Sequence, residues 1–449
     1  MIQWFAGSLE QAFSEARMQK KLLLIFWSAK WCPFCQALRA TVFTRQDMRE
    51  KAARFVPVYL DGDQPGAQQL GQALNLSGYP TVAVLRSDRQ EIARIAGGLD
   101  LTRYSRLLDD LLEDERPIDE VLADATNDSA YRRLAFHAWD AADQRERTAG
   151  LTERLATAAR RCFGEERARI EIHALAFAIE SADGPALTER VPMLASLLGD
   201  SERSRCIVDL LVQFDSRVFA AAASFGTAFA ESFSQGWSAV MIDAARDARF
   251  GAAERLAAIA SALEATKALR PDHAIPGEMT GAARVLAVEV LAADRDGHER
   301  GDIVNAAKSV YIALGDDAAA YALLETEIPN SRTPCFYMSG LASLDEKNDR
   351  PALAIDWMIR AHAASTGPAT RAQWGESCVS GLIRLAADNV PMIRATALRV
   401  VNELDGADAL HGRTRVRIDR MLAALEAWAN TPERRAAVRE VVAAMTTIS

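Results

Sequence analysis

The sequence predicts an α/β domain with a central mixed sheet flanked by helices, followed by an all-α helical-repeat solenoid. Strand-like and helix-like stretches alternate up to residues 111–119, where "LLEDERPID" leads into a proline. Beyond that point almost only helical periodicity is present. Two helix–turn–helix units of similar length then occupy part of the last third of the chain. We therefore expect an α/β domain over 1–114, a helical domain with degenerate repeats over 115–300, and tetratricopeptide-like helical repeats over 301–449.

The order of the elements carries the α/β prediction. The apolar run "LLLIFWS" is typical of a buried strand, and the amphipathic run that precedes it is typical of a helix. The expected elements are an extended piece (2–5), a helix (9–21), a strand (22–28), a helix (35–43), a strand (55–63), a helix (66–75), a pair of strands (81–86 and 91–98) and a helix (101–114).

The helical part contains a weak internal repeat. The turns Gly315-Asp316 and Asn348-Asp349 each join two amphipathic helices and lie 33 residues apart, near the ~34 of a tetratricopeptide repeat. A more degenerate unit follows at 381–401. Further amphipathic helices are expected at 151–163, 186–198 and 252–269. Such helices bury their apolar stripes by stacking, and the groove this leaves binds a peptide or partner protein. The alternative is that they only brace the first domain or form a dimer.

Composition excludes several classes of protein. The chain has 449 residues, 49% apolar and 25% charged, with a net charge of −9. Residues 1–114 carry 14 basic and 13 acidic side chains, so the helical part holds the acidity and nucleic acid is not an expected partner. Uncharged stretches are shorter than the ~18 residues of a membrane span. No signal peptide follows Met1, so we expect a cytoplasmic protein, or a periplasmic one if this start is a processed or truncated form.

The stretch "FWSAKWCPFCQ" (26–36) places two cysteines one helical turn apart where the buried strand gives way to a helix. Unpaired N–H groups and the helix dipole stabilise a thiolate there. Cys32 is expected to be the exposed nucleophile with a low pKa, and Cys35 the resolving thiol. Pro33 suits the first turn because it lacks an N–H. Lys30 adds positive charge nearby.

Other uses of this motif need partners elsewhere in the sequence. Zinc would require a second cysteine pair, and the remaining cysteines stand alone. Haem attachment would require a histidine after Cys35, where Gln36 stands. We expect no metal. The remaining cysteines are expected to be unpaired core thiols, although their spacings leave two pairings open, Cys162 with Cys206 and Cys335 with Cys378.

These residues resemble the thioredoxin superfamily over about 1–114. The resemblance rests on "FWSAKWCPFC" and on "SGYPTVAVL", some 45 positions further on. It implies that the Tyr79-Pro80 bond is cis and that Pro80 faces the cysteine pair, completing a catalytic set of Cys32, Cys35 and Pro80. It also implies that Trp31, Phe34 and Tyr79 form an apolar rim that binds a protein substrate, whose backbone pairs with that of residue 79.

Two departures from that family are visible. Many thioredoxins have a buried acid on the strand before the motif and a lysine on the next strand, where Ile25 or Phe26 and Pro57 stand here. The "CPFC" motif is similar to those of glutaredoxins and disulfide isomerases, although the helix from Leu9 to Lys20 favours the thioredoxin plan. Together with "GPATRAQWG" (367–375), the order of motifs resembles a group of bacterial thioredoxin-fold proteins with a long helical C-terminal region.

The resemblance implies a protein thiol–disulfide oxidoreductase of the reductase or isomerase type. Its dithiol is itself the redox group, so no cofactor is expected. The expected partners are client proteins with disulfides and an upstream dithiol reductant or disulfide donor; the oligomeric state stays open. Because reduction, oxidation and isomerisation share one mixed-disulfide chemistry, the direction also stays open. The alternative is a non-catalytic adaptor or scaffold, in which the solenoid binds partners and the first domain is structural or redox-sensing.

Overall fold

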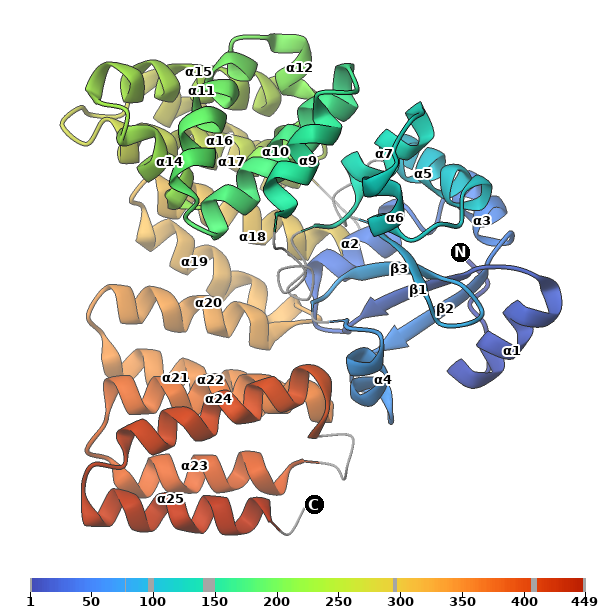
Figure 1. Cartoon of the computed structure of the whole chain (residues 1–449). Helices are drawn as coiled ribbons and strands as arrows, with labels where there is room; N and C mark the ends of the chain where they lie inside the picture. Colours follow the sequence, from blue (N-terminus) through green and yellow to red (C-terminus); the bar gives the residue numbers. More distant parts are fainter. Residues whose placement is uncertain are drawn as a thin grey trace. The chain divides into compact units, whose positions relative to one another are not determined.

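The α/β region is built on one four-stranded sheet. The computed structural model (Figure 1) describes residues 2–76, 78–95, 101–139, 150–293, 297–404 and 410–446. The strands lie in the order β2-β1-β3-β4. Their bounds are β1 (Leu23–Ser28), β2 (Val56–Asp61), β3 (Thr81–Leu85) and β4 (Glu91–Ile95). Each predicted strand is therefore present, and residues 96–98 of the predicted last strand lie outside the described residues.

Burial explains the strand pattern. All six residues of β1 are buried, as expected for a strand with a neighbour on either side. Strands β3 and β4 pair antiparallel, with Val82 opposite Ile95 and an irregularity between Val84 and Leu85. The predicted strand pair is thus confirmed.

Five helices belong to the α/β region. They are α1 (Leu9–Gln19), α2 (Pro33–Thr41), α3 (Gln46–Ala52), α4 (Ala67–Ala73) and α5 (Leu101–Glu113). Helix α1 begins with a capping box between Ser8 and Gln11. Helix α3 was not predicted, because its sequence "QDMREKA" is mostly polar and its N-cap, Arg45, makes no capping hydrogen bond.

Helices form almost all of the rest of the described chain. Their bounds as far as the predicted 300/301 boundary are α6 (Ile118–Ala123), α7 (Asp128–Phe136), α9 (Leu151–Ala159), α10 (Gly164–Glu180), α11 (Gly184–Leu198), α12 (Ser201–Arg205), α13 (Val208–Leu211), α14 (Ser216–Ala223), α15 (Thr227–Arg246), α16 (Ala252–Leu269) and α17 (Gly277–Ala292), with α18 (Gly297–Ala313) crossing it. The remaining helices are α19 (Asp317–Glu327), η1 (Ile328–Asn330), α20 (Pro334–Lys347), α21 (Pro351–Ala364), α22 (Pro368–Leu385), α23 (Val390–Asn402), α24 (Gly412–Trp428) and α25 (Pro432–Met445). The predicted fold class, an α/β domain followed by a helical region, is confirmed.

The two turns that defined the repeat lie where they were expected. Gly315, with a φ of +73°, separates α18 from α19, and Asp349, with a φ of +54°, separates α20 from α21. These are helix–turn–helix units. Their assignment as tetratricopeptide repeats stays a prediction, as do the domain boundaries at 114/115 and 300/301.

By its contacts the chain divides into two compact units. The first comprises Met1–Leu24, Ala37–Pro57 and Val82–Ala320, and the second comprises Ile25–Gln36, Val58–Thr81 and Tyr321–Ser449. The boundary passes through the α/β region. The second unit therefore joins the Cys-x-x-Cys stretch and the Tyr79-Pro80 stretch to the C-terminal helices.

Within the second unit, the C-terminal helices form a layered stack. Figure 1 shows α20 to α25 (orange to red) stacked on one another, with α24 lying over α22 and α25 beside α23, and each of α21, α22 and α23 packs on the helix before it. Helix α24 packs on both α22 and α4. An apolar core joins α22 to α25, with Val379, Ile393, Ile418 and Met421 fully buried. This core fixes the N-terminal ends of α22 and α24, which carry part of the site described below.

Candidate active site

Cys32 and Cys35 share the first turn of α2. Cys32 directly precedes Pro33, the first helical residue, and its carbonyl accepts the first helical hydrogen bond, from Gln36 (3.2 Å). The backbone N–H of Cys35 donates to Cys32 Sγ over 3.2 Å. The Cys32 sulfur therefore acts as an N-cap, in the place where a serine or aspartate oxygen usually satisfies an unpaired N–H.

Cys32 is not exposed. The exposed fraction is 2% for Cys32 and 0% for Cys35, and both thiols are free. The prediction of an exposed Cys32 is wrong. The neighbouring residue Trp31 packs against Trp374 of the C-terminal helices. Burial strongly raises the pKa of Cys32, and the Cys35 side chain raises it further.

The relative pKa values of Cys32 and Cys35 also differ from the prediction. Burial acts against a Cys35 thiolate, but hydrogen bonds from Cys32, Ala29 and Ser28, together with the charge of Arg413, hold the pKa of Cys35 below its ordinary value. In this closed arrangement Cys35 is the thiol of the pair with the lowered pKa, and Cys32 is the one with the raised pKa. This is the reverse of the order that the motif predicted.

The covering residues come from the first turns of α22 and α24. We call them the helical cover: Thr370, Gln373 and Trp374 of α22, with Arg413, Thr414 and Arg417 of α24. Trp374 meets Trp31 edge to face at 5.7 Å between ring centroids. The Arg413 guanidinium lies 4.8 Å from the centre of the Tyr79 ring. Between Trp31, Tyr79, Ala369 and the residues of the cover other than Trp374 there remains a cavity of only about 10 Å³, just enough for one water molecule.

Asp63, just after β2, binds the start of α22. Its two carboxylate oxygens accept from the Thr370 backbone N–H (2.8 Å) and from the Thr370 hydroxyl (2.5 Å). The N-cap residue Gly367 has a φ of +93°, and a Cβ atom there would overlap the Asp63 carboxylate. A carboxylate at a helix N-terminus also interacts favourably with the helix dipole. These contacts join residues 307 positions apart in the sequence.

Helix α4 binds the start of α24 in a similar way. Gln68 Oε1 accepts from the backbone N–H groups of Arg413 (3.0 Å) and Thr414 (3.3 Å), and Gln72 Oε1 accepts from that of Gly412 (2.9 Å). The two glutamines thereby satisfy amides that no residue within α24 reaches. Gln68 Nε2 in turn donates to the Gly62 carbonyl (2.7 Å), so α4, the β2–α4 loop and α24 form one hydrogen-bonded unit.

Tyr79 contacts both the aromatic residues beside the dithiol and the helical cover. The Tyr79-Pro80 bond is cis, so that prediction is confirmed. The Tyr79 ring meets Trp27 at 5.3 Å and Trp31 at 6.1 Å, and burial raises the pKa of its hydroxyl. Both Tyr79 and Pro80 are half-buried, and Ser77 of the same motif lies outside the described residues. The structure thus brings Trp31 and Tyr79 together as predicted, but their rings contact the cover.

Three other predicted residues lie around this centre. Lys30 has a side chain that is 82% exposed, and its amine lies 3.5 Å from Asp61 Oδ2. Pro33 is buried as the first residue of α2, and Phe34, 43% exposed, is the most open of the predicted apolar rim. The cation whose charge acts on both sulfurs is Arg413. The supporting role of Lys30 stays a prediction.

The remaining cysteines are core or near-core thiols. All are free; Cys162, Cys335 and Cys378 are buried, and burial raises the pKa of each to about 11. Cys206 is half-buried, with a pKa that burial also raises. Such thiols stay protonated near neutral pH and are poor nucleophiles. In the part of the chain that the structure describes, no group of three or more His, Cys, Asp or Glu side chains is arranged to hold a metal ion.

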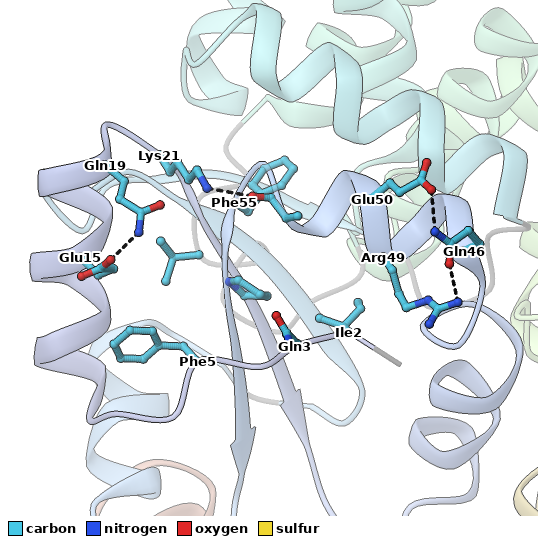
Figure 2. A pocket seen from close by; sticks show the side chains of 13 residues that line it. Ile2, Gln3, Phe5, Glu15, Gln19, Lys21, Gln46, Arg49, Glu50 and Phe55 are labelled. Atoms are coloured by element: carbon cyan, nitrogen blue, oxygen red, sulfur yellow. Dashed lines mark hydrogen bonds between the residues drawn. The ribbon is translucent and has the colours of Figure 1, made fainter.

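A much larger cavity lies in the first unit. It holds about 600 Å³ and is lined by the N-terminal segment, α1, α3 and the start of β2. Figure 2 shows its polar side chains bonded to one another: Gln46 to Glu50 (2.6 Å) and Arg49 to Gln46 (2.5 Å). None of the predicted site residues lines it.

Sequence reasoning missed the residues that close the site: Asp63, Gln68, Thr370, Gln373, Trp374 and Arg413. One signal was present. The segment "GPATRAQWG" supplies Gly367 and Thr370 to Asp63, Gln373 to Arg413, and Trp374 to Trp31. The resemblance to a group of bacterial thioredoxin-fold proteins drew attention to this segment, but no pattern along the chain indicated what it contacts.

Comparison with known proteins places the α/β region in a family. Residues 9–112 match the family described as Thioredoxin-like domain. The thiol:disulfide interchange protein DsbD of Vibrio cholerae serotype O1 is 30% identical to this chain over 95 residues, which are 20% of this chain and 16% of DsbD. The chain thus matches less than a fifth of the length of that relative. No helix in the described ranges is both long enough and apolar enough to span a bilayer.

Proposed function

We propose that this chain is a protein thiol–disulfide oxidoreductase that acts through Cys32 and Cys35. The observation that carries the proposal is the hydrogen bond from the Cys35 N–H to Cys32 Sγ, 3.2 Å long, at the N-terminus of α2. It provides the donor that a thiolate at position 32 needs, with the second thiol one turn away. The thioredoxin-like match over 9–112 and the similarity to a thiol:disulfide interchange protein support the same chemistry.

The reaction transfers two electrons from the dithiol to a client disulfide. The Cys32 thiolate attacks one client sulfur, which breaks the client S–S bond, forms a mixed disulfide and releases one client thiolate that takes up a proton. Cys35 then loses its proton and attacks Cys32 Sγ. The mixed disulfide breaks, the second client thiol is released, and a Cys32–Cys35 disulfide remains. An upstream dithiol reductant restores the pair, or a disulfide donor drives the sequence in reverse.

A client reaches Cys32 only after the helical cover has separated from Trp31 and Tyr79. Separation exposes these two rings and the backbone beside cis-Pro80, the surface that would hold an extended client segment. It also returns Cys32 to water, which lowers the cost of ionising it, while the Cys35 N–H stays in place. The helical region then serves two purposes, closing the site and selecting the client or partner that opens it.

Insulin-disulfide reduction tests this function. The wild-type chain should reduce insulin with dithiothreitol as the reductant, and Cys32→Ser should be inactive because the thiol that attacks the client is gone and Cys35 lies fully buried one turn into the helix. Cys378→Ser removes a buried thiol of high pKa and is the matched control, which should keep wild-type activity. A wild-type rate no higher than that of Cys32→Ser would overturn the proposal.

The burial of Cys32 favours one rival, an adaptor whose helical region binds partners and whose dithiol is structural or redox-sensing. Trapping distinguishes the two functions. In Cys35→Ala a client stays attached to Cys32 as a mixed disulfide, because no thiol is left to release it. Reductant-sensitive adducts at Cys32 support the oxidoreductase. Partners that co-purify without any adduct support the adaptor.

The reduction potential of the pair decides the direction of transfer. A value near that of thioredoxin, about −270 mV, indicates a reductase, and a value near −180 mV or above indicates an isomerase or oxidant. Equilibration with glutathione buffers, followed by separation of reduced and oxidised protein, measures it. The same measurement also indicates which compartment suits the protein, the reducing cytoplasm or an oxidising one.

A further inference from the structure

Arg413 is a half-buried cation whose charge acts on the dithiol, and it comes from the far end of the chain. Its backbone N–H is bound by Gln68, and its guanidinium donates to Gln373 Oε1 (2.9 Å) and lies 4.8 Å from the Tyr79 ring centre. The backbone and the guanidinium of Arg413 are therefore each held in place, and an arginine keeps its charge in such a site.

In the surroundings of the two thiols, a thiolate requires a nearby positive charge to stabilise it. Both sulfurs are shielded from water, and burial alone makes a thiolate costly. Lys30, the nearest cation in sequence, has an exposed side chain whose amine lies beside Asp61. A fixed cation in a water-poor site acts more strongly than a mobile one at the surface.

We propose that Arg413 is a positioning residue for the dithiol: its guanidinium, held on the Tyr79 ring by the helical cover, stabilises a thiolate on the Cys32–Cys35 pair. The proposal rests on the dithiol of the proposed function but requires no client. Other charged or titratable groups face the same space, namely Asp61 and Asp63 near β2, Tyr79, and Arg417 of α24, which donates to Glu376 (3.1 Å). The two carboxylates raise the pKa of Tyr79, whereas the charge of Arg413 lowers the pKa of both thiols.

Redox state and closure are then linked. The reduced pair carries a thiolate that attracts Arg413, whereas the Cys32–Cys35 disulfide carries no charge and gains nothing from it. Closure therefore favours the reduced form, and by reciprocity oxidation weakens closure. Because the reduced state is stabilised in this way, the reduction potential of the Cys32–Cys35 pair is higher.

Titration of the thiolate on the full chain tests the proposal. Ultraviolet absorbance of the thiolate is followed from about pH 4 to about pH 9 in the wild type, Arg413→Gln and Arg413→Lys. Arg413→Gln should raise the lowest thiol pKa by about one unit, and Arg413→Lys should stay close to the wild type because it keeps the charge. Arg415→Gln is the matched control on the same helix, since Arg415 is exposed and pairs with Asp419.

A second readout separates charge from mere packing. Arg413→Gln should shift the equilibrium with glutathione about tenfold towards the disulfide, or ~30 mV towards a more negative potential. Arg413→Lys should shift it less than threefold, and this variant keeps the test decisive if Arg413→Gln fails to fold. An unchanged titration and potential in Arg413→Gln, or equal shifts in Arg413→Gln and Arg413→Lys, would overturn the proposal. Because no client is present, the result is independent of insulin reduction.

Discussion

Two cavities of this molecule differ in volume, and the smaller one is the one that lies beside the dithiol motif. The cavity in the first unit holds about 600 Å³, and its charged side chains bond mainly to residues close in sequence. The cavity beside Tyr79 in the second unit holds about 10 Å³ and adjoins the residues of the dithiol motif. The space beside the reactive end of α2 is therefore occupied by side chains that are distant in the sequence, those of the helical cover.

The two cavities also differ in the sequence separation of the residues that bond to one another around them. At the large cavity, Gln46, Arg49 and Glu50 of α3 satisfy one another within a turn of helix. At the small one, side chains after β2 and on α4 bind helix ends more than 300 positions away. A site closed by such long-range contacts opens when those contacts break, without loss of the local structure that holds the dithiol. The following tests use the alkylation rate of Cys32, measured by mass spectrometry, to report opening.

The largest effect is expected for Gly367→Ala. The substitution imposes a positive φ on alanine, at a cost of about 1–2 kcal/mol, and its Cβ overlaps the Asp63 carboxylate. About 3 kcal/mol in total corresponds to roughly 100-fold faster alkylation of Cys32. Gly226→Ala is the matched control: Gly226 is also an N-cap, with a φ of +97°, and nothing lies within 4 Å of its Cβ position. Equal rates in the two variants would contradict the closing role of Asp63.

Asp63→Ala should open the site about tenfold. It removes the acceptors of the Thr370 N–H and hydroxyl, and a charged hydrogen bond contributes about 1.5–3 kcal/mol before the cost of burying the carboxylate is subtracted. Asp63→Asn keeps an acceptor for the N–H and should stay within about threefold of the wild type. If Asp63→Asn opens the site as much as Asp63→Ala, the contact depends on charge and not on the paired hydrogen bonds.

Closure should weaken as the pH rises from acid towards neutral. Burial raises the pKa of Asp63 and outweighs the hydrogen bonds from Thr370 that lower it. A carboxyl whose pKa is higher in the closed state binds its proton more tightly there. Its contribution is thus complete below the ordinary value of about 3.9 and is lost as the pH passes the raised value. Hydrogen exchange of the Thr370 amide in the oxidised protein, whose disulfide carries no charge, should show this loss in the wild type and not in Asp63→Asn after correction for intrinsic rates. Protection that grows with pH would contradict it.

The contact between Trp31 and Trp374 should contribute a smaller coupling. Edge-to-face aromatic pairs contribute about 1 kcal/mol beyond their area, equivalent to roughly a fivefold change in opening. A double-mutant cycle with Trp31→Ala and Trp374→Ala, read through Cys32 alkylation, isolates this energy. Additive effects of the two substitutions would show that the rings do not couple.

The smallest effect is expected in the large cavity. Glu50→Ala removes an acceptor for Gln46 on an exposed face and should change the free energy of unfolding by no more than about 0.5 kcal/mol. Alkylation of Cys32 should match the wild type. A faster rate would show that the two regions are coupled, and the comparison between them would fail.

Sequence reasoning succeeded wherever a short pattern carries the structure. The buried run at 23–28 and the helix that starts at Pro33 follow from residues adjacent in the chain, and the cis bond before Pro80 was implied by the resemblance to the thioredoxin superfamily. It failed at α3, whose polar sequence gave no period. It also failed on the exposure of Cys32, since the motif describes the turn that carries the sulfur and not the distant side chains that cover it.

The sequence alone determined that two thiols occupy the first turn of a helix after a buried strand, because hydrophobic periodicity, proline and cysteine spacing act over a few residues. Only the tertiary structure decided the environment of those thiols. Their burial, the contact of Trp31 with Trp374 and the charge of Arg413 depend on which apolar faces pack together. Packing unites segments with no shared pattern, so residues that the motif does not contain form the surroundings of the dithiol.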